Sequence, residues 1–488
     1  MMLVVHGVVG ASSLVLDTAY LGSSLASFAA LGITNDFDVV NGLTVYQQVS
    51  EFYAEAGDGA YLWLVVTAKA GAYATYVAST TFKNLIRGTI QADITKRAKM
   101  IGICYDPPTA QQSTADFPSD VTATLIALQA TQVAMAADGF PFSAILDGYN
   151  MSSTATSNTI QTMATKACPS VSTCITGSTP NGVASVGAAL GRLARISIGH
   201  GFGETDDGPI SLTTTYLTNG VSLFINGTAI SAGTALTATH SYMVLTGPVA
   251  YNGTIYSFGS PFYCSAGVTT FTGGTVADLT STGTVAINSP YLVVAGPITY
   301  NGAVYGTGQK FVTDGTHTTF TGGIVQLLNS TDVTKLFQDD YNNFGSKQYL
   351  FYCPYYQLSG LYWNDGATCD LAVNPLSTQE YNRVGNHFLS ALLNFLALLK
   401  GKNVPIDNKT GLVEASFVKT QQQIFFDTYI KPALIPVAPN TVGDISDGSL
   451  VLIGTPNGNQ VNWTYTLTII GTPLVGSANG TIVFSNTI

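Results

Sequence analysis

The sequence predicts a multidomain protein of mixed α/β and α+β class, with an all-β module inserted into its core. Three observations support this fold class. The chain has 488 residues, more than the roughly 250–300 that one hydrophobic core usually holds. Its first two hundred residues alternate strand-like and helix-like stretches, a pattern typical of layered α/β structure. Past Thr213 the helix formers thin out, and Gly, Thr, Tyr and Val dominate.

Changes in composition along the chain suggest the domain boundaries. We predict an N-terminal arm and first strand at 1–20, an α/β domain at 21–214, an inserted all-β module at 215–330, the C-terminal part of the core with strands and two helices at 331–450, and C-terminal strands with an arm at 451–488.

Apolar runs and helical spacing indicate the elements of the α/β domain. Tyr61–Val66 and Met100–Tyr105 are short apolar runs of the kind found in buried strands. Tyr46–Ala56 and Val121–Ala137 carry apolar residues at helical spacing, so we expect both to pack on a sheet. The charged stretch Asp93–Lys99 mixes both signs, which is typical of a solvated helix face.

An internal repeat marks the inserted module. Tyr242–Tyr256 aligns without gaps with Tyr291–Tyr305, and Phe271–Val276 aligns with Phe320–Val325 at the same offset of 49 residues. Self-similarity of this kind indicates that one supersecondary unit has been duplicated. Each copy contains an Asn-Gly pair, which supplies the positive φ of a tight hairpin turn. The repeat therefore predicts two similar sets of antiparallel strands.

The mixed pattern resumes after the module. Gln348–Cys353 is strand-like, and Ser377–Leu399 predicts a long helix with a capping box between Ser377 and Glu380. This helix is apolar nearly all round, so we expect it to be buried or to lie at an interface. A second helix is predicted over Glu414–Ile430, and strands follow it.

The composition favours a self-assembling structural protein. Charged residues make up 9% of the chain, against about 25% in typical soluble domains. The chain also has 25 Tyr and 23 Phe, too many aromatic residues for a disordered protein. Surfaces that are buried against other copies are depleted in charge and enriched in aromatic residues.

The charge balance and the apolar segments of the sequence argue against nucleic-acid binding, export and membrane insertion. A net charge of −10 with 18 Lys and Arg opposes nucleic-acid binding, because phosphate contacts need clustered cations. Met1–Gly32 has no Lys or Arg and so lacks the charged region of a signal peptide. No apolar run is long enough to predict a membrane span. We expect no nucleic-acid partner, no direct membrane insertion and synthesis in the cytoplasm.

The stretch most similar to an enzyme site is Gly199–Gly208, which places His200 beside Glu204, Asp206 and Asp207. Such a mixture can serve general acid–base chemistry or metal binding. It lacks the spacing of a calcium loop, and no nucleophile motif accompanies it. We favour a Gly-rich turn that follows a strand.

Other polar and glycine-rich stretches have structural interpretations. Gly182–Arg195 contains no GxGxxG or P-loop spacing, so small residues along a tightly packed helix are favoured over a phosphate site. His6, His240, His317 and His387 have no second His or Cys at ligand spacing. We interpret Asp339–Asp340 as a solvated face. Tyr355–Tyr356 and Tyr362–Trp363 suit core or interface packing better than a sugar platform.

The cysteines do not predict a metal site. Their spacing lacks the paired ligands of structural zinc. We expect free buried thiols, with a Cys168–Cys174 disulfide as the alternative. The cysteines are Cys104, Cys168, Cys174, Cys264, Cys353 and Cys369. The sequence therefore assigns no catalytic residue, no cofactor-binding residue and no metal ligand.

Several stretches together resemble the tail sheath proteins of contractile phages and of phage-tail-like contractile injection systems. The likeness covers about 1–214 and 331–450. It rests on Tyr20–Leu25, Leu31–Ile33, Val49–Tyr53, Gly57–Trp63, Ser185–Leu193 and Gly360–Thr368.

The resemblance implies a sheath-like core in which the module at 215–330 is a decoration. It implies that copies form stacked rings, hexameric in that family, around a tail tube and contract to drive the tube through a target envelope. The tube protein, the baseplate and the tail terminator would be partners, and the virion tail or injection-machine sheath, made in the bacterial host cytoplasm, the location. Sheath arms add strands to neighbouring sheets, and Met1–Val9 and Val461–Phe484 have the apolar, β-prone sequence this needs.

Two other structural classes remain open. A β-repeat surface adhesin or S-layer-like protein would use the module to bind glycans, but it would need export. Another virion tail component, such as the tube, would share the self-assembly. An enzyme would have to rely on His200 and its acidic neighbours.

Overall fold

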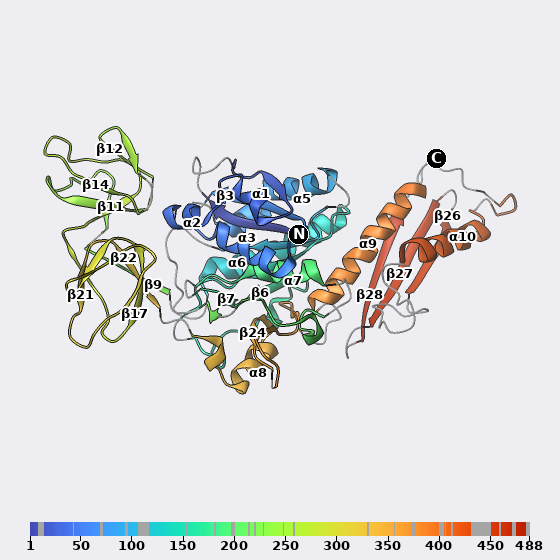
Figure 1. The fold of residues 1–488 in the computed structure, drawn as a ribbon. Coiled ribbons are helices and arrows are strands. Elements are labelled where there is room, and N and C mark those ends of the chain that lie inside the picture. The colour runs from blue at the N-terminus through green and yellow to red at the C-terminus, as the bar shows by residue number, and fades with distance from the viewer. Residues whose placement is uncertain are drawn as a thin grey trace.

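A computed structural model gives the fold of the chain (Figure 1). It describes residues 1–7, 14–41, 43–68, 72–92, 96–105, 117–152, 155–179, 182–196, 201–212, 215–218, 221–227, 229–246, 248–256, 259–328, 331–355, 357–371, 377–399, 405, 407–410, 413–430, 450–457, 460–470 and 475–484. An α/β domain lies in the middle, with the β module on one side of it and a C-terminal lobe on the other (Figure 1).

A seven-stranded sheet forms the centre of the α/β domain, in the order β2-β3-β1-β4-β5-β6-β23. Neighbouring strands are parallel except that β2 runs antiparallel to β3. Parallel strands are buried on both faces and so consist of continuous apolar runs, as in β3. The strands are β1 (Met2–Gly7), β2 (Ala19–Gly22), β3 (Leu62–Ala68), β4 (Met100–Ile103), β5 (Ser143–Asp147), β6 (Val171–Cys174) and β23 (Tyr349–Leu350).

Helices cover this sheet, which confirms the predicted α/β architecture. Helices α3 and α7 pack on each other and on the central strands, while α4 packs on α6 and α6 on β5 and β6. The helices are α1 (Leu25–Ala29), α2 (Asn35–Asn41), α3 (Val45–Ala56), α4 (Tyr73–Ala78), α5 (Thr80–Ala92), α6 (Ser119–Ala137) and α7 (Val186–Arg195), with short 3-10 turns at Ala164–Lys166, Thr205–Asp207 and Val333–Lys335.

The N-terminal segment is an interior strand. β1 pairs with β3 on one side, from Met2–Trp63 to Gly7–Ala68, and with β4 on the other. Its whole length is buried. The expectation that Met1–Val9 is an arm exchanged with neighbouring copies is therefore wrong for Met2–Gly7, because its backbone groups and both faces are already used within the chain.

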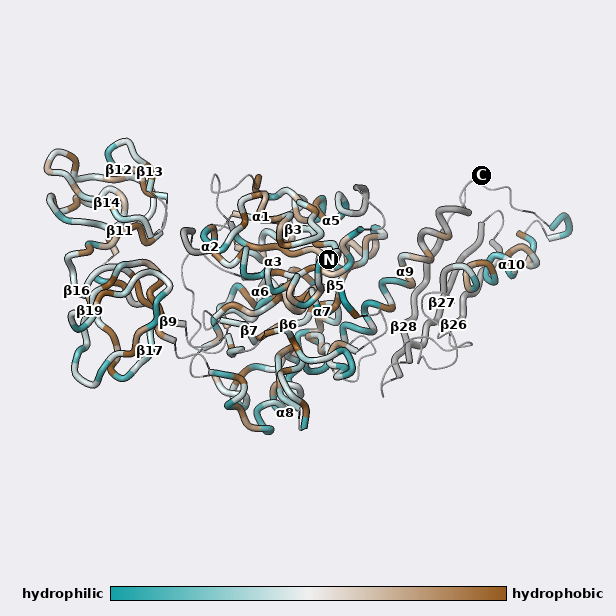
Figure 2. The backbone as a smooth tube through the Cα atoms, in the orientation of Figure 1, coloured by the Kyte–Doolittle hydropathy of each residue, from teal (hydrophilic) through white to brown (hydrophobic). Residues whose placement is uncertain are grey.

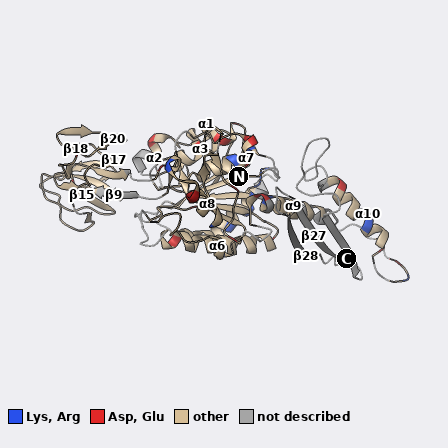
Figure 3. Cartoon of the chain, turned by 90° about the horizontal axis from the view of Figure 1, so that it is seen from below, with Lys and Arg blue, Asp and Glu red and all other residues tan. Residues whose placement is uncertain are grey.

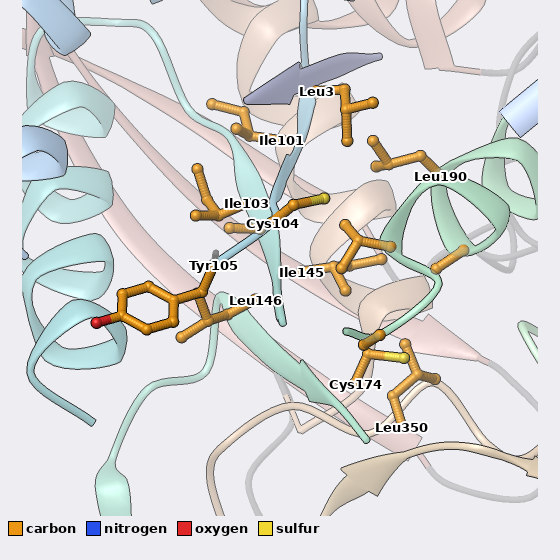
Figure 4. Packing of buried hydrophobic residues seen from close by; sticks show 14 of the residues in the cluster. Leu3, Ile101, Ile103, Cys104, Tyr105, Ile145, Leu146, Cys174, Leu190 and Leu350 are labelled. Carbon is orange, nitrogen blue, oxygen red and sulfur yellow. The ribbon is translucent and has the colours of Figure 1, made fainter. Parts of the chain in front are cut away.

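One hydrophobic core joins the sheet to its helices. Figure 4 shows Leu3, Ile101 and Ile145 of three adjacent strands beside Leu190 of α7. Gly102 of β4 permits this approach, because a Cβ there would lie 2.6 Å from Val186 of α7. Figure 2 shows the hydrophobic stretches along the strands in the middle of the domain.

The inserted module begins and ends at neighbouring points of the chain. Val221 pairs with Leu328, so its first and last strands are neighbours, and the backbone N–H of Leu217 donates to the carbonyl oxygen of Thr331 at 2.8 Å. The two ends of the module therefore leave the α/β domain side by side. At the start of the module, β8 (Tyr216–Leu217) pairs with β7 (Thr176–Gly177) of the α/β domain. The other strands of the module are β9 (Val221–Ile225), β10 (Ile230–Ser231), β11 (Ser241–Thr246), β12 (Val249–Tyr251), β13 (Thr254–Tyr256), β14 (Pro261–Tyr263), β15 (Thr275–Asp278), β16 (Thr282–Thr284), β17 (Pro290–Ala295), β18 (Ile298–Tyr300), β19 (Ala303–Tyr305), β20 (Lys310–Val312), β21 (Thr319–Thr321) and β22 (Ile324–Leu328).

The Asn-Gly pairs form the predicted hairpin turns. Asn252 and Gly253 have φ values of 47° and 77°, both positive as in a type I′ turn. Asn301 and Gly302 repeat this with 46° and 74°. Positive φ at both central positions matches the twist of the flanking strands. The duplicated sequence therefore folds as a duplicated structure.

Each repeat is built around one phenylalanine. The ring of Phe262 lies 4.7 Å from Tyr251 and 5.1 Å from Tyr256, measured between centroids. In the second repeat Phe311 lies 5.3 Å from Tyr300 and 4.9 Å from Tyr305. Charged residues are nearly absent from the module, which is drawn almost wholly in tan in Figure 3. Its charged residues are Asp278, Lys310 and Asp314.

The C-terminal region returns to mixed structure, as predicted. The strand expected at Gln348–Cys353 is divided between β23 and β24, because the chain leaves the central sheet after Leu350. The remaining elements are α8 (Gln338–Ser346), β24 (Tyr352–Cys353), β25 (Tyr362–Trp363), α9 (Gln379–Leu399), α10 (Ala415–Phe425), a π-helical turn at Phe426–Ile430, β26 (Leu450–Asn457), β27 (Gln460–Ile470) and β28 (Val475–Phe484). None of the described helices has the length and apolar character needed to cross a membrane.

Candidate functional site

The polar loop that most resembled an enzyme site surrounds a buried arginine. Arg192 of α7 donates from Nη2 to the carbonyl oxygen of Glu204 at 2.7 Å and from Nη1 to that of Asp207 at 2.9 Å. Burial lowers the pKa of the guanidinium, and neighbouring Arg195 lowers it further. The carboxylate of Glu204 accepts from the backbone N–H of Gly201 at 2.7 Å. The described part of the loop therefore holds a structural cation, and His200 lies outside the described residues.

Gly182–Arg195 behaves as the tightly packed helix that the sequence favoured. Helix α7 crosses α3 so closely that a Cβ on Gly187 would lie 1.9 Å from the carbonyl oxygen of Gln48. A Cβ on Gly191 would lie 2.4 Å from the carbonyl oxygen of Phe52. The small residues serve helix packing, and the Gln48 side chain closes the contact by accepting from the N–H of Gly187 at 2.7 Å.

The four histidines named from the sequence lie in separate environments. Their partners are Tyr73 for His6 (ring centroids 4.2 Å apart), Asp278 for His240 (2.5 Å), Asp314 for His317 (2.7 Å) and Lys99 for His387 (3.5 Å). Within the described ranges, no three His, Cys, Asp or Glu side chains come together as a metal site.

The cysteines are free buried thiols, as expected. Cys168 and Cys174 are not joined by a disulfide. Burial raises the pKa of Cys174 and of Cys369 to about 12. Because the thiolate is the reactive form, these groups are chemically inert near neutral pH.

The remaining predicted residues have packing or capping roles. Trp363 is buried, with its ring 4.1 Å from Tyr352 and 4.8 Å from Phe202. Tyr356 lies outside the described residues. Asp340 is not merely part of a solvated face, since its carboxylate accepts from the N–H of Phe337 at 3.0 Å and from the hydroxyl of Ser157 at 2.5 Å.

The sequence analysis did not identify the buried carboxyl group of Glu51 as a feature of interest. Glu51 of α3 accepts hydrogen bonds from the hydroxyl of Ser178 and, at 2.9 Å, from Nε2 of Gln47. Burial raises the pKa of this carboxyl although these donors favour the ionised form. The nearby phenol of Tyr352 also has its pKa raised, first by burial and then by Cys174. The spacing of Gln47, Gln48 and Glu51 was not informative, because polar residues on a helix usually face solvent.

A row of polar side chains attaches α9 to the α/β domain. Gln379 donates from Nε2 to the hydroxyl of Ser172 at 2.7 Å, and Asn382 donates from Nδ2 to the carbonyl oxygen of Pro169 at 2.6 Å. One turn further on, Asn386 donates to the hydroxyl of Ser143 at 2.9 Å.

Two charged residues extend this row. Arg383 donates from Nη2 to the carbonyl oxygens of Leu193 and Ile196, both at 3.2 Å. Glu380 accepts from the N–H of Phe202, which is a contact with the core of the α/β domain. The signal for this junction was the recurrence of amide side chains every three or four residues, which places them on one face of the helix.

The second half of α9 belongs to the C-terminal lobe. Phe388 and Phe395 pack on Phe425 of α10, with ring centroids 5.8 Å and 5.2 Å apart. Helix α9 also contacts β27 and β28, and α10 contacts β26. One helix therefore connects the α/β domain with the C-terminal lobe (Figure 1).

The lobe contains a three-stranded antiparallel sheet in the order β26-β27-β28. β27 pairs with β26 from Leu450–Leu467 to Asn457–Gln460, and with β28 from Val461–Phe484 to Ile470–Val475. In the described part of the chain, β26 and β28 have no strand on their outer sides. Edge strands present unpaired N–H and C=O groups that can pair with another chain.

Comparison with protein families finds a match to the N-terminal part of the chain. Residues 3–229 are similar to the family described as DUF2586, N-terminal domain. The match therefore covers the part of the α/β domain that precedes the module, together with the first strands of the module. None of the curated proteins matches the chain.

Proposed function

We propose that the chain is the structural subunit of a contractile tail sheath. The observation that carries the proposal is the C-terminal sheet, which projects from the α/β domain on α9 and has two edges without a strand partner among the described residues. An extended segment can add to such an edge through main-chain hydrogen bonds. The low fraction of charged residues, 9%, supports extensive burial between copies.

The exchanged strand in this proposal is β28. Among the described residues it pairs only with β27, so it can leave the sheet without opening the sheet interior. β1 cannot do this, because it has strands on both sides. A subunit that accepts a neighbour's strand beside β27 or β26 and donates its own forms a continuous chain of contacts, as ring and helical assemblies require.

Helix α9 gives this linkage a mechanical role. Its first half is hydrogen-bonded to the α/β domain and its second half packs on α10. Movement of the linked sheets is therefore transmitted to the α/β domain through a helix of 21 residues. Contraction needs two arrangements of the subunit interfaces, reached as packed units move past one another.

The proposal extends to partners and location. Copies would stack as rings, hexameric as in the family that the sequence resembles, around a tail tube protein, with a baseplate and a tail terminator at the ends. Contraction would drive the tube through a target envelope, in a virion tail or an injection machine made in the bacterial host cytoplasm. No step in this function uses a catalytic residue or a cofactor.

Negative-stain electron microscopy of the purified chain at high concentration tests the proposal. We expect rings or hollow striated tubes. A chain that stops at Gly471 lacks β28 and should form no extended tubes, while its α/β domain still unfolds cooperatively on heating. A chain without residues 221–328 is the matched control, because it keeps the C-terminal sheet. Dispersed monomers under all conditions would contradict the sheath and favour the adhesin alternative.

A further inference from the structure

Basic side chains meet where α9 crosses the edge of the central sheet at which the parallel strands begin. Lys99 directly precedes β4, and His387 lies in the middle of α9. The ammonium Nζ of Lys99 is 3.5 Å from Nδ1 of His387. Arg97 is close enough to lower the pKa of both. The sequence had suggested a solvated helix face for Asp93–Lys99, but Lys99 is half-buried beside a strand.

The backbone fixes this meeting point. The carbonyl oxygen of Lys99 accepts from the N–H of Ser143, the first residue of β5, at 3.0 Å. The hydroxyl of the same serine accepts from Asn386, the neighbour of His387 on α9. Lys99 and His387 are therefore held next to each other by hydrogen bonds that connect the start of β4, the start of β5 and α9.

No counter-charge is provided by the described residues. The ion pairs among them join other groups, and none connects Arg97, Lys99 or His387 to a carboxylate. Burial lowers the pKa of Lys99 to about 8, with a further contribution from Arg97. Burial, then Lys99 and Arg97, lower the pKa of His387 to about 4. At pH 7 the group holds two positive charges beside a neutral imidazole.

We propose that Arg97, Lys99 and His387 form a binding site for an oxyanion at the junction between the central sheet and α9. Guanidinium and ammonium groups are the donors that bind carboxylate and phosphate most strongly. An oxyanion would replace water lost from these cations and offset their mutual repulsion. It would also fasten α9, and with it the C-terminal lobe, to the α/β domain.

The oxyanion can come from two sources. One is inorganic phosphate, which needs no assembly. The other is an Asp or Glu carboxylate of a second copy, and this source alone rests on the proposed sheath function. A chain with a net charge of −10 offers such carboxylates on every copy.

Thermal melting of the dispersed full-length chain tests the site, with phosphate compared against chloride at equal ionic strength. Phosphate should raise the Tm by about 2–4 °C, the shift expected for roughly 1 kcal/mol of binding free energy. Lys99→Met should lose this shift. Lys310→Met, at an exposed lysine of the module, should keep it.

Substitutions of His387 show whether a change in Tm comes from an oxyanion bound at this site or from a general effect of salt. His387→Glu places a carboxylate beside Lys99, so it should melt above His387→Gln without phosphate and should no longer respond to phosphate. His387→Gln keeps both cations and should retain part of the shift.

The outcomes also separate the sources. A phosphate shift that Lys99→Met abolishes supports the site with phosphate as ligand. No phosphate shift, but a more stable His387→Glu and loss of self-association in Lys99→Met by sedimentation, supports a carboxylate from a second copy. No phosphate shift together with His387→Glu melting below His387→Gln overturns the site, whatever electron microscopy shows of tubes.

Discussion

The α/β domain and the β module are stabilised in different ways. The core of the α/β domain is one cluster that draws on residues from Met2 to Cys369. Each repeat of the module instead has its own cluster, within 236–276 and 285–325, and a small third cluster joins the repeats. Loss of one element from the α/β domain therefore damages a shared core, whereas the module can be removed as a unit.

Removal of β1 should have the largest effect, and it tests whether the core of the α/β domain depends on each of its strands. We expect a chain that lacks Met1–Val9 to be insoluble or to show no cooperative unfolding. Met2, Leu3, Val4 and Val5 are at most 1% exposed. Burial of such a side chain contributes about 1.5–3 kcal/mol, so their loss approaches the 5–15 kcal/mol total of a typical domain.

Circular dichroism and calorimetry measure this effect. The chain that stops at Gly471 is the matched control, because it also loses an apolar terminal strand but one at a sheet edge. A cooperative transition near that of the complete chain after loss of Met1–Val9 would show that β1 is dispensable.

A substitution at the contact between α3 and α7 tests whether the shared core can accommodate one additional methyl group. Gly187→Ala should lower the free energy of unfolding by about 1–3 kcal/mol, because a new methyl group would press on the backbone of Gln48 rather than on a flexible side chain. Gly88→Ala is the control. It lies in α5, where a Cβ meets nothing within 4 Å, and should stabilise the chain by about 0.5–1 kcal/mol. Equal effects in chemical denaturation would contradict the tight crossing.

Glu51 should make the stability of the α/β domain depend on pH. Its pKa is raised in the folded chain, so the folded state binds the proton more tightly than the unfolded state. The contribution of Glu51 to the free energy of unfolding is therefore fully present below the pKa of about 4.3 that it has in the unfolded chain. This contribution is lost as the pH rises through the pKa that Glu51 has in the folded chain.

Glu51→Gln removes this dependence. We expect it to be more stable than the original chain at pH 8 by about 1 kcal/mol, and the difference to shrink towards pH 4. Denaturant unfolding at a series of pH values measures it. A difference that grows as pH falls would mean that Glu51 is ionised when folded.

The sequence was sufficient for elements that depend on local patterns. The 49-residue repeat and its Asn-Gly turns specified two similar sets of strands, because hairpin geometry is set by a few adjacent residues. The helices around Tyr46–Ala56 and Val121–Ala137 followed from apolar spacing.

The errors concern position and partners rather than element type. An apolar terminal segment can be an exchanged arm or an interior strand, and its period cannot distinguish them. The continuous run Met2–Val5 was the available signal, since interior parallel strands are apolar on both faces. Lys99 and His387 are separated by 288 residues, so no local pattern could bring them together.

Removal of the module should have the smallest effect of these changes. Without residues 221–328 the chain can close directly, because Val221 pairs with Leu328 and Leu217 is hydrogen-bonded to Thr331. Leu217 and Val333, which flank the deletion, belong to the core of the α/β domain and remain in place. We expect the Tm of that domain to change by less than about 4 °C, equivalent to roughly 1 kcal/mol.

Calorimetry should show one transition of the complete chain disappear while the other persists. Loss of both transitions would mean that the module and the α/β domain fold as one cooperative unit, and the contrast between shared and separate cores would then fail.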